Sequence, residues 1–97
     1  MPSGLEFEWD PAKAQANVRK HKVPFVMACE VFKDPKRAES PDASSEHDEA
    51  RWIALGRVQQ TILSVVFTER GGRIRLISAR RANRDEQQTY WTGDVPA

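Results

Sequence analysis

Arginine is the residue type whose number and spacing could do chemistry in this chain. The strands and turns described below place Arg51, Arg70, Arg73 and Arg75 at one end of one sheet face. Like charges directly opposite each other destabilise a sheet, so such a cluster needs either water or an anion. A guanidinium stays charged, and its planar fork binds phosphate oxygens in pairs. The sequence leaves two interpretations, a solvated strand end or an anion site.

The arginines are positioned by a stretch that predicts a three-stranded antiparallel meander. Predicted strands span 51–58, 61–69 and 73–80, and they are rich in β-branched and aromatic residues. Gly71-Gly72 suits a two-residue hairpin turn, and a second turn is inferred at Gln59-Gln60 from the spacing. Alternation then predicts a core face with Trp52, Ala54, Leu63, Val65, Phe67, Ile74 and Leu76, and a second face with Ile53, Leu55, Ile62, Val66 and Ile77.

The predicted register brings the arginines together on the second face. Arg51 and Arg75 fall on either side of Thr68, and Arg70 pairs with Arg73 just beyond them. The same register puts Arg80 on the core face, opposite Leu63. The alternative for Arg80 is to face the C-terminal helix and pair with Glu86.

Length and composition indicate one small domain, covering residues 1–97. Hydrophobic residues are 39% and charged residues 30% of the chain, and the net charge is +1. That charge argues neither for nor against nucleic acid, but its distribution is uneven. Residues 39–49 hold five acids and no Lys or Arg, whereas residues 70–84 are rich in arginine and hold no acid. The asymmetry favours an anionic partner for the C-terminal third.

Several classes of protein and site find no support. Cys29 is the only cysteine, so no intrachain disulfide forms, and its apolar surroundings predict a core residue. His21 and His47 lie far apart with no Cys pair, so the sequence predicts no metal site and no cofactor. No apolar run is long enough to span a membrane and no signal peptide is evident, which makes the cytoplasm the expected compartment.

The rest of the chain predicts helices around the meander. Glu6–Trp9 alternates like a short strand, and a helix follows from Ala12 to His21, capped by Asp10 with Pro11 at its first position. This helix should turn Ala12, Ala16 and Val18 inward. A second helix over 24–32 should bury a stripe made of Phe25, Ala28, Cys29 and Phe32.

An edge strand over 36–40 and a C-terminal helix over 82–91 complete the prediction. The order is β-α-α-β-β-β-β-α. We therefore expect an α+β fold with antiparallel pairing, two N-terminal helices and a short C-terminal helix.

An arginine cluster near proton-transfer groups suits metal-free RNA cleavage. The 2′-hydroxyl attacks the neighbouring phosphate, a base takes its proton, an acid protonates the leaving oxygen, and cations stabilise the phosphorane. Candidates for proton transfer are Lys20, His21, Glu86 and Tyr90. Each also has a structural interpretation: Lys20 and His21 end a helix, Glu86 pairs with an arginine or caps its own helix, and Tyr90 packs that helix on the sheet.

Three motifs in order resemble the BrnT family of bacterial toxins. They are FEWDPAKAQANVRKHKVPF, then VFKDP, then RWIALGRV with VVFTERGGRIRLISARRANRDE, and together they cover about residues 6 to 90. The resemblance implies a RelE-like fold and a ribonuclease toxin of a type II toxin–antitoxin system, which arrests growth by cutting RNA. It also implies a BrnA-type antitoxin that neutralises the toxin and carries the DNA-binding domain, so that DNA is contacted only through the antitoxin.

Carried onto this sequence, the resemblance nominates Arg70, Arg75 and Arg80 as phosphate or transition-state contacts, with Lys20 and His21 next. Two other functions stay open. One is a non-catalytic binding module whose arginines dock an acidic partner. The other, less supported, is direct DNA binding, for which the sequence shows no recognition helix.

Overall fold

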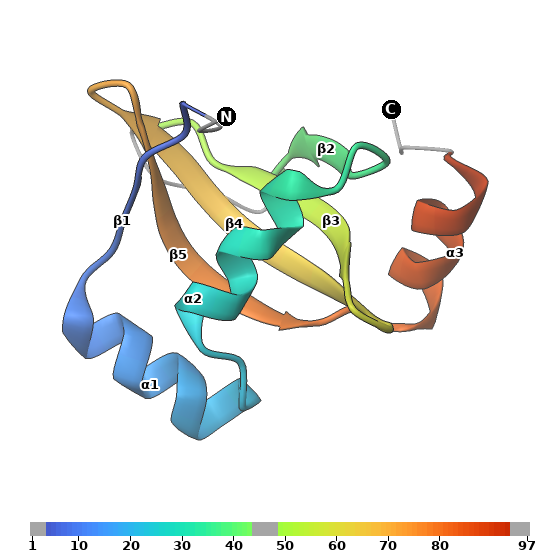
Figure 1. Ribbon diagram of the computed structural model, residues 1–97, viewed down its shortest axis with the longest axis horizontal. Coiled ribbons are helices and arrows are strands. Elements are labelled where there is room, and N and C mark those ends of the chain that lie inside the picture. Colours follow the sequence, from blue (N-terminus) through green and yellow to red (C-terminus); the bar gives the residue numbers. More distant parts are fainter. Residues whose placement is uncertain (1–3, 44–48, 94–97) are drawn as a thin grey trace.

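The computed structural model describes residues 4–43 and 49–93, which form one mixed β-sheet with helices on both faces (Figure 1). The elements are β1 (Phe7–Glu8), α1 (Pro11–His21), α2 (Phe25–Ala28), the 3-10 helix η1 (Cys29–Lys33), β2 (Ala38–Pro41), β3 (Trp52–Val58), β4 (Thr61–Arg70), β5 (Arg73–Arg81) and α3 (Arg84–Thr92). The α+β class and the order of elements are confirmed. The second predicted helix is shorter than expected, because only four residues are α-helical before the chain tightens into η1.

The sheet has the strand order β1-β5-β4-β3-β2, and one pairing in it was not expected. The meander and β2 pair antiparallel, as predicted. β1 instead runs parallel to β5, with Phe7 opposite Ile74 and Glu8 opposite Arg75. The prediction of purely antiparallel pairing is therefore wrong, and the N-terminal strand lies beside the last strand of the meander.

Local signals explain the ends of the helices. Asp10 caps α1, since its Oδ1 accepts a hydrogen bond from the Ala12 N–H at 2.9 Å, and Pro11 occupies the first turn. Asn83 caps α3 in a capping box: it accepts from the Glu86 N–H, and the Glu86 carboxylate accepts from the Asn83 N–H, both at 2.9 Å.

The turns of the meander are those expected. Gly71 and Gly72 have φ values of 60° and 79°, which a two-residue hairpin turn requires and glycine adopts without strain. Gln59 has a φ of 57° in the other turn. These two turns fix the register between β3 and β4 and the start of the register between β4 and β5.

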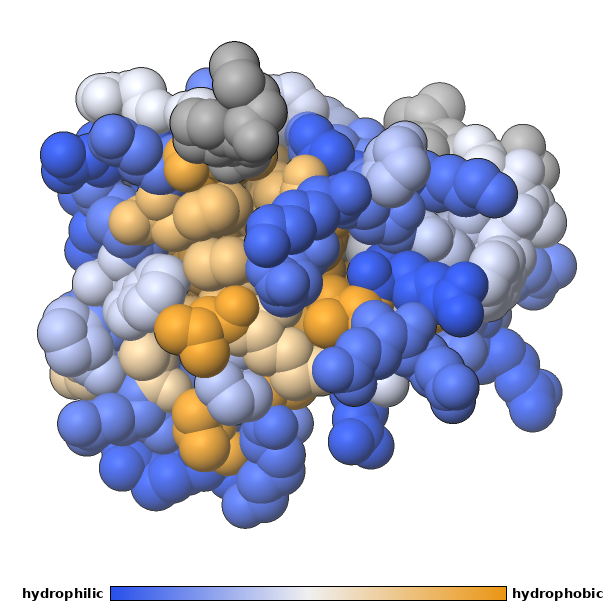
Figure 2. All heavy atoms as spheres, in the orientation of Figure 1, coloured by the Kyte–Doolittle hydropathy of each residue, from blue (hydrophilic) through white to orange (hydrophobic). Residues whose placement is uncertain are grey.

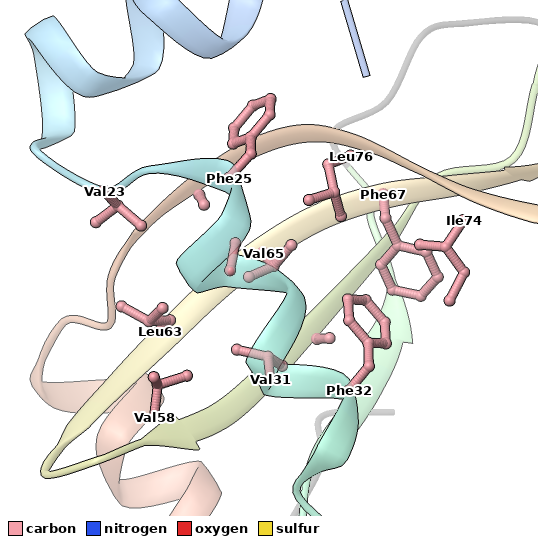
Figure 3. Packing of buried hydrophobic residues seen from close by; sticks show 13 residues of the cluster. Val23, Phe25, Val31, Phe32, Val58, Leu63, Val65, Phe67, Ile74 and Leu76 are labelled. Atoms are coloured by element: carbon pink, nitrogen blue, oxygen red, sulfur yellow. The ribbon is translucent and has the colours of Figure 1, made fainter. Parts of the chain in front are cut away.

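The main core lies between one sheet face and α2 with η1 (Figure 3). Phe25, Ala28 and Phe32 of the predicted stripe are buried, whereas Cys29 is half-buried, and burial raises the pKa of its thiol. Gly56 permits the close contact: a Cβ added there would lie 2.5 Å from Val31 Cγ1. The helical layer therefore rests directly on β3.

Helix α1 turns a different side inward from the one predicted. Ala12, Ala16 and Val18 are exposed, and Asn17 is buried in their place. The Asn17 side chain accepts from the Ala79 N–H at 3.1 Å and donates to the carbonyls of Ala79 and Val23 at 2.8 and 2.9 Å. A polar residue is inside because it completes the hydrogen bonds of β5 beyond the end of β1.

A β-bulge corrects the predicted position of Arg80. Phe67 pairs with Leu76 but Val66 pairs with Ser78, so Ile77 is an extra residue in β5. Beyond it, Arg80 lies opposite Ser64 on the second face, not opposite Leu63 on the core face. The predicted register is thus correct up to Leu76 and displaced by one residue beyond it.

The helical side of the molecule carries its own exposed apolar side chains (Figure 2). Val18 is 40% exposed and Val26 is 67% exposed.

Among the helices in residues 4–43 and 49–93, none combines the length and apolar character needed to cross a membrane.

Candidate functional site

Four arginines converge on the second sheet face beside the β4–β5 turn. Thr68 lies directly opposite Arg75, Arg70 lies opposite Arg73, and Arg51 immediately precedes β3. Thr68 is buried, and its hydroxyl donates to the Ala50 carbonyl at 2.6 Å, which holds the chain that carries Arg51. We call this set (Arg51, Arg70, Arg73 and Arg75) the arginine end. The predicted convergence is confirmed.

Glutamates from two distant segments meet these arginines. Arg75 Nη1 donates to Glu8 Oε2 at 2.8 Å, and Arg73 Nε donates to Glu6 Oε2 at 3.1 Å. Arg70 Nη2 donates to Glu49 Oε2 at 3.0 Å. Strand β1 supplies Glu8, and the residue just before the strand supplies Glu6. Sequence reasoning missed both because nothing local predicts that β1 pairs with β5.

The third carboxylate, Glu49, lies in the field of three guanidinium groups. The hydrogen bond from Arg70 lowers the pKa of Glu49, and the charges of Arg70, Arg51 and Arg75 lower it further. Arg51 Nε is buried and has no hydrogen-bond partner within residues 4–43 and 49–93, an uncommon state for a charged group. The arginine end therefore already holds an anion and retains an unsatisfied donor.

The rest of the second face becomes more buried along the strands toward α3. Ile53, Val66 and Ser78 are half-buried in its middle. At the other end α3 covers it, where Leu55 and Ile62 are buried together with Ala82 and Tyr90 in a second small core.

Under α3, Arg80 and Glu86 form a two-bond ion pair. Arg80 Nη1 and Nη2 donate to the two Glu86 carboxylate oxygens at 2.7 and 2.9 Å. The hydrogen bonds to Glu86 raise the pKa of Arg80. Burial acts to raise the pKa of Glu86, but the hydrogen bonds from Arg80 and from the Asn83 N–H outweigh it, and the pKa of Glu86 is lowered. The alternative prediction of Arg80 pairing with Glu86 is confirmed.

Tyr90 anchors the same helix to the opposite layer. Its hydroxyl donates to Asp34 Oδ2 at 2.6 Å, and Asp34 also accepts from the backbone N–H groups of Arg57 and Lys36. Burial and the Asp34 hydrogen bond raise the pKa of Tyr90 to about 12. We call the set Arg80, Glu86, Tyr90, Asp34 and Ser64 the helix end.

The structure therefore distributes the predicted site residues over three places. Ser64 beside Arg80 and Thr68 beside Arg75 are four residues apart on β4, roughly 14 Å at the rise of an extended strand. Lys20 and His21 end α1, across the molecule from the β4–β5 turn (Figure 1). His47 lies outside the described residues. Within the described ranges, no three or more His, Cys, Asp or Glu side chains group to hold a metal ion.

Comparison with protein families decides the relationship suggested by the motifs. The family model described as the ribonuclease toxin, BrnT, of type II toxin–antitoxin systems matches residues 9–86. The chain belongs to the BrnT family. No curated protein gives a significant match. The BrnT match includes all four residues of the arginine end and begins just after Glu8.

Proposed function

We propose that this BrnT family member is a metal-independent endoribonuclease that binds an RNA phosphate at the arginine end. The observation that carries the proposal is the convergence of four guanidinium groups beside the β4–β5 turn, where the Arg70 and Arg73 side chains are more than half exposed. Arg51 and Arg75 flank the position next to the buried Thr68, and Glu49 already places an anionic group within their field.

The proposed chemistry is attack of a 2′-hydroxyl on the adjacent phosphate. Guanidinium groups aimed at the phosphoryl oxygens stabilise the charge that develops in the phosphorane, and their fork geometry fixes the phosphate. Arg75 and Arg70 act as phosphate or transition-state contacts, and Arg51 and Arg73 bind the substrate. Arg80, Glu86 and Tyr90 hold α3 in place, through the Arg80–Glu86 ion pair and the hydrogen bond from Tyr90 to Asp34.

The family relationship extends the proposal to the cell. The toxin acts on RNA in the cytoplasm and arrests growth, and a BrnA-type antitoxin with a DNA-binding domain neutralises it. The α+β sheet with its helices supports a RelE-like fold. Residues 1–97 form one toxin domain.

The first experiment measures RNA cleavage by the purified chain in EDTA. Arg75→Ala should lower cleavage about 10²–10³-fold, as loss of one preorganised charge-stabilising donor does in other enzymes. Arg81→Ala, which removes an exposed arginine from the same strand, is the matched control and should stay near wild type. Full cleavage by a folded Arg75→Ala protein, judged by circular dichroism, contradicts the site.

A binding module without catalysis is the second candidate. It is favoured by one observation: the partners of Arg70, Arg73 and Arg75 are all carboxylates. In that case folded wild type cleaves no RNA, and it binds an acidic peptide in a manner that Arg75→Ala abolishes.

A further inference from the structure

Glu8 is the most firmly held carboxylate of the arginine end. Its side chain is 25% exposed, against 36% for Glu49 and 69% for Glu6. Besides the Arg75 contact, its other oxygen lies 3.7 Å from Arg73 Nη1. The backbone around it is fixed as well, because the Ile74 N–H donates to the Glu6 carbonyl at 2.8 Å. Glu8 therefore keeps its place when a ligand binds.

Glu49 marks where that ligand's charge would lie. It precedes β3 outside any strand, and it joins the cluster through one exposed ion pair with Arg70, a kind of contact that contributes little. A phosphate can therefore take its position among Arg51, Arg70 and Arg75. Arg75 then contacts the phosphate while its Nη1 remains on Glu8, so that a single guanidinium lies between the phosphate and the Glu8 carboxylate.

We propose that Glu8 is the catalytic base that takes the proton of the attacking 2′-hydroxyl, an inference that rests on the proposed ribonuclease activity. The 2′-oxygen forms its bond to phosphorus as its proton passes to Glu8 Oε2 or Oε1. The bond from phosphorus to the 5′-oxygen breaks, giving a 2′,3′-cyclic phosphate. The 5′-oxygen takes a proton from water, and the hydroxide that this leaves takes the proton from Glu8.

The other proton-transfer candidates are placed less well. Both Glu86 oxygens accept from Arg80, and the pair lies along β4 at roughly 14 Å from Thr68. The Tyr90 hydroxyl donates its hydrogen bond to Asp34. Lys20 and His21 lie at the far end of α1 (Figure 1). Among the described residues, Glu8 is the group that combines a fixed position, a carboxylate and direct contact with Arg75.

The test compares Glu8→Gln with Glu69→Gln, which removes the same charge from an exposed side chain on β4. Glu8→Gln should lower kcat/KM for RNA about 10²–10³-fold, the range expected for a lost general base. Binding of an all-2′-deoxy oligonucleotide, which has no hydroxyl to deprotonate, should not weaken. Glu69→Gln should change cleavage less than about threefold, since surface charge changes alone have small effects.

A further readout separates catalysis from positioning. Glu8→Ala should regain activity in added formate, whereas Arg75→Ala should not. Glu8 is not the base if Glu8→Gln cleaves RNA at the wild-type rate. The same conclusion follows if Glu8→Gln weakens binding of the deoxy oligonucleotide as Arg75→Ala does and formate restores no activity to Glu8→Ala. Absence of cleavage by folded wild type overturns the proposed function, and the role of Glu8 with it.

Discussion

The two ends of the second sheet face are built from the same residue types and differ in how completely those residues are satisfied. At the helix end, Arg80 and Glu86 exchange two hydrogen bonds, and Glu86 also caps α3. At the arginine end, Arg70 and Arg75 each make one ion pair and Arg73 contacts both Glu6 and Glu8, while Arg51 Nε has no hydrogen-bond partner among the described residues. Helix α3 covers the first end, whereas the Arg70 and Arg73 side chains at the second end are more than half exposed.

The difference teaches that arginine content alone does not locate a site. A guanidinium that donates two hydrogen bonds to one carboxylate, as Arg80 does to Glu86, contributes to the fold. A guanidinium held by a single hydrogen bond to a carboxylate, as Arg70 and Arg75 are, keeps further donors for an incoming anion. Judged in this way, Arg80 belongs with the fold, although its residue type and strand are those of Arg75.

Removing Arg80 should produce the largest effect that distinguishes the two ends. Arg80→Ala leaves the partly buried Glu86 without its partner and should lower the free energy of unfolding by about 1–2 kcal/mol, a value reduced because Arg80 is itself 41% exposed. Urea denaturation measures the change. Cleavage per folded molecule should stay within about threefold of wild type.

Arg75→Ala provides the reciprocal comparison in the same denaturation experiment. Its unfolding midpoint should shift less than that of Arg80→Ala, since the Arg75 contact with Glu8 is a single hydrogen bond. If Arg80→Ala abolishes cleavage without affecting unfolding, the division between the two ends is wrong.

Titration of Tyr90 gives an intermediate effect. It is the only tyrosine, so tyrosinate absorbance reports on it alone, and it should titrate near about 12. The folded pKa is raised, so the contribution of this contact to stability is complete below pH about 10 and is lost as the pH rises through about 12. Asp34→Asn should give Tyr90 a pKa between about 10 and about 12, because burial, the larger cause of the shift, remains. Urea-unfolded protein is the control and should titrate near 10.

Glu49 should give the smallest effect, with the opposite sign. Glu49→Gln removes a carboxylate that competes with phosphate and should tighten binding of a deoxy oligonucleotide about two- to fivefold, most clearly at low salt. Glu69→Gln, an exposed neighbour on β4, is the control. Weaker binding in Glu49→Gln would show that this carboxylate orders the arginines and does not occupy the anion position.

The sequence predicted those parts of the molecule that depend on neighbours in the chain. The glycine turn at 71–72, the Asp10 cap and the alternation along β3 and β4 are local signals, and all are confirmed. They were sufficient to bring Arg51, Arg70, Arg73 and Arg75 together. The match to the BrnT family confirms the relationship that the motifs suggested.

What the sequence did not predict depends on contacts between distant residues. The bulge at Ile77 has no glycine or proline to mark it, yet it moves Arg80 from one face to the other. The pairing of β1 with β5 brings Glu8 to Arg75 across 67 residues. Helical spacing favoured alanine and valine as the inward residues of α1, and the need to complete the β5 backbone placed Asn17 there instead.

Asn17 also limits strand pairing between copies of the chain. Strand β1 pairs with β5 at only two positions, so the rest of that border would present free N–H and C=O groups to any extended chain. The Asn17 amide offers one donor and one acceptor at Ala79, as a neighbouring strand would, but it is a single side chain and cannot be extended. The sheet therefore ends at this border, and the backbone groups of Ala79 are not available to pair with a strand of another molecule.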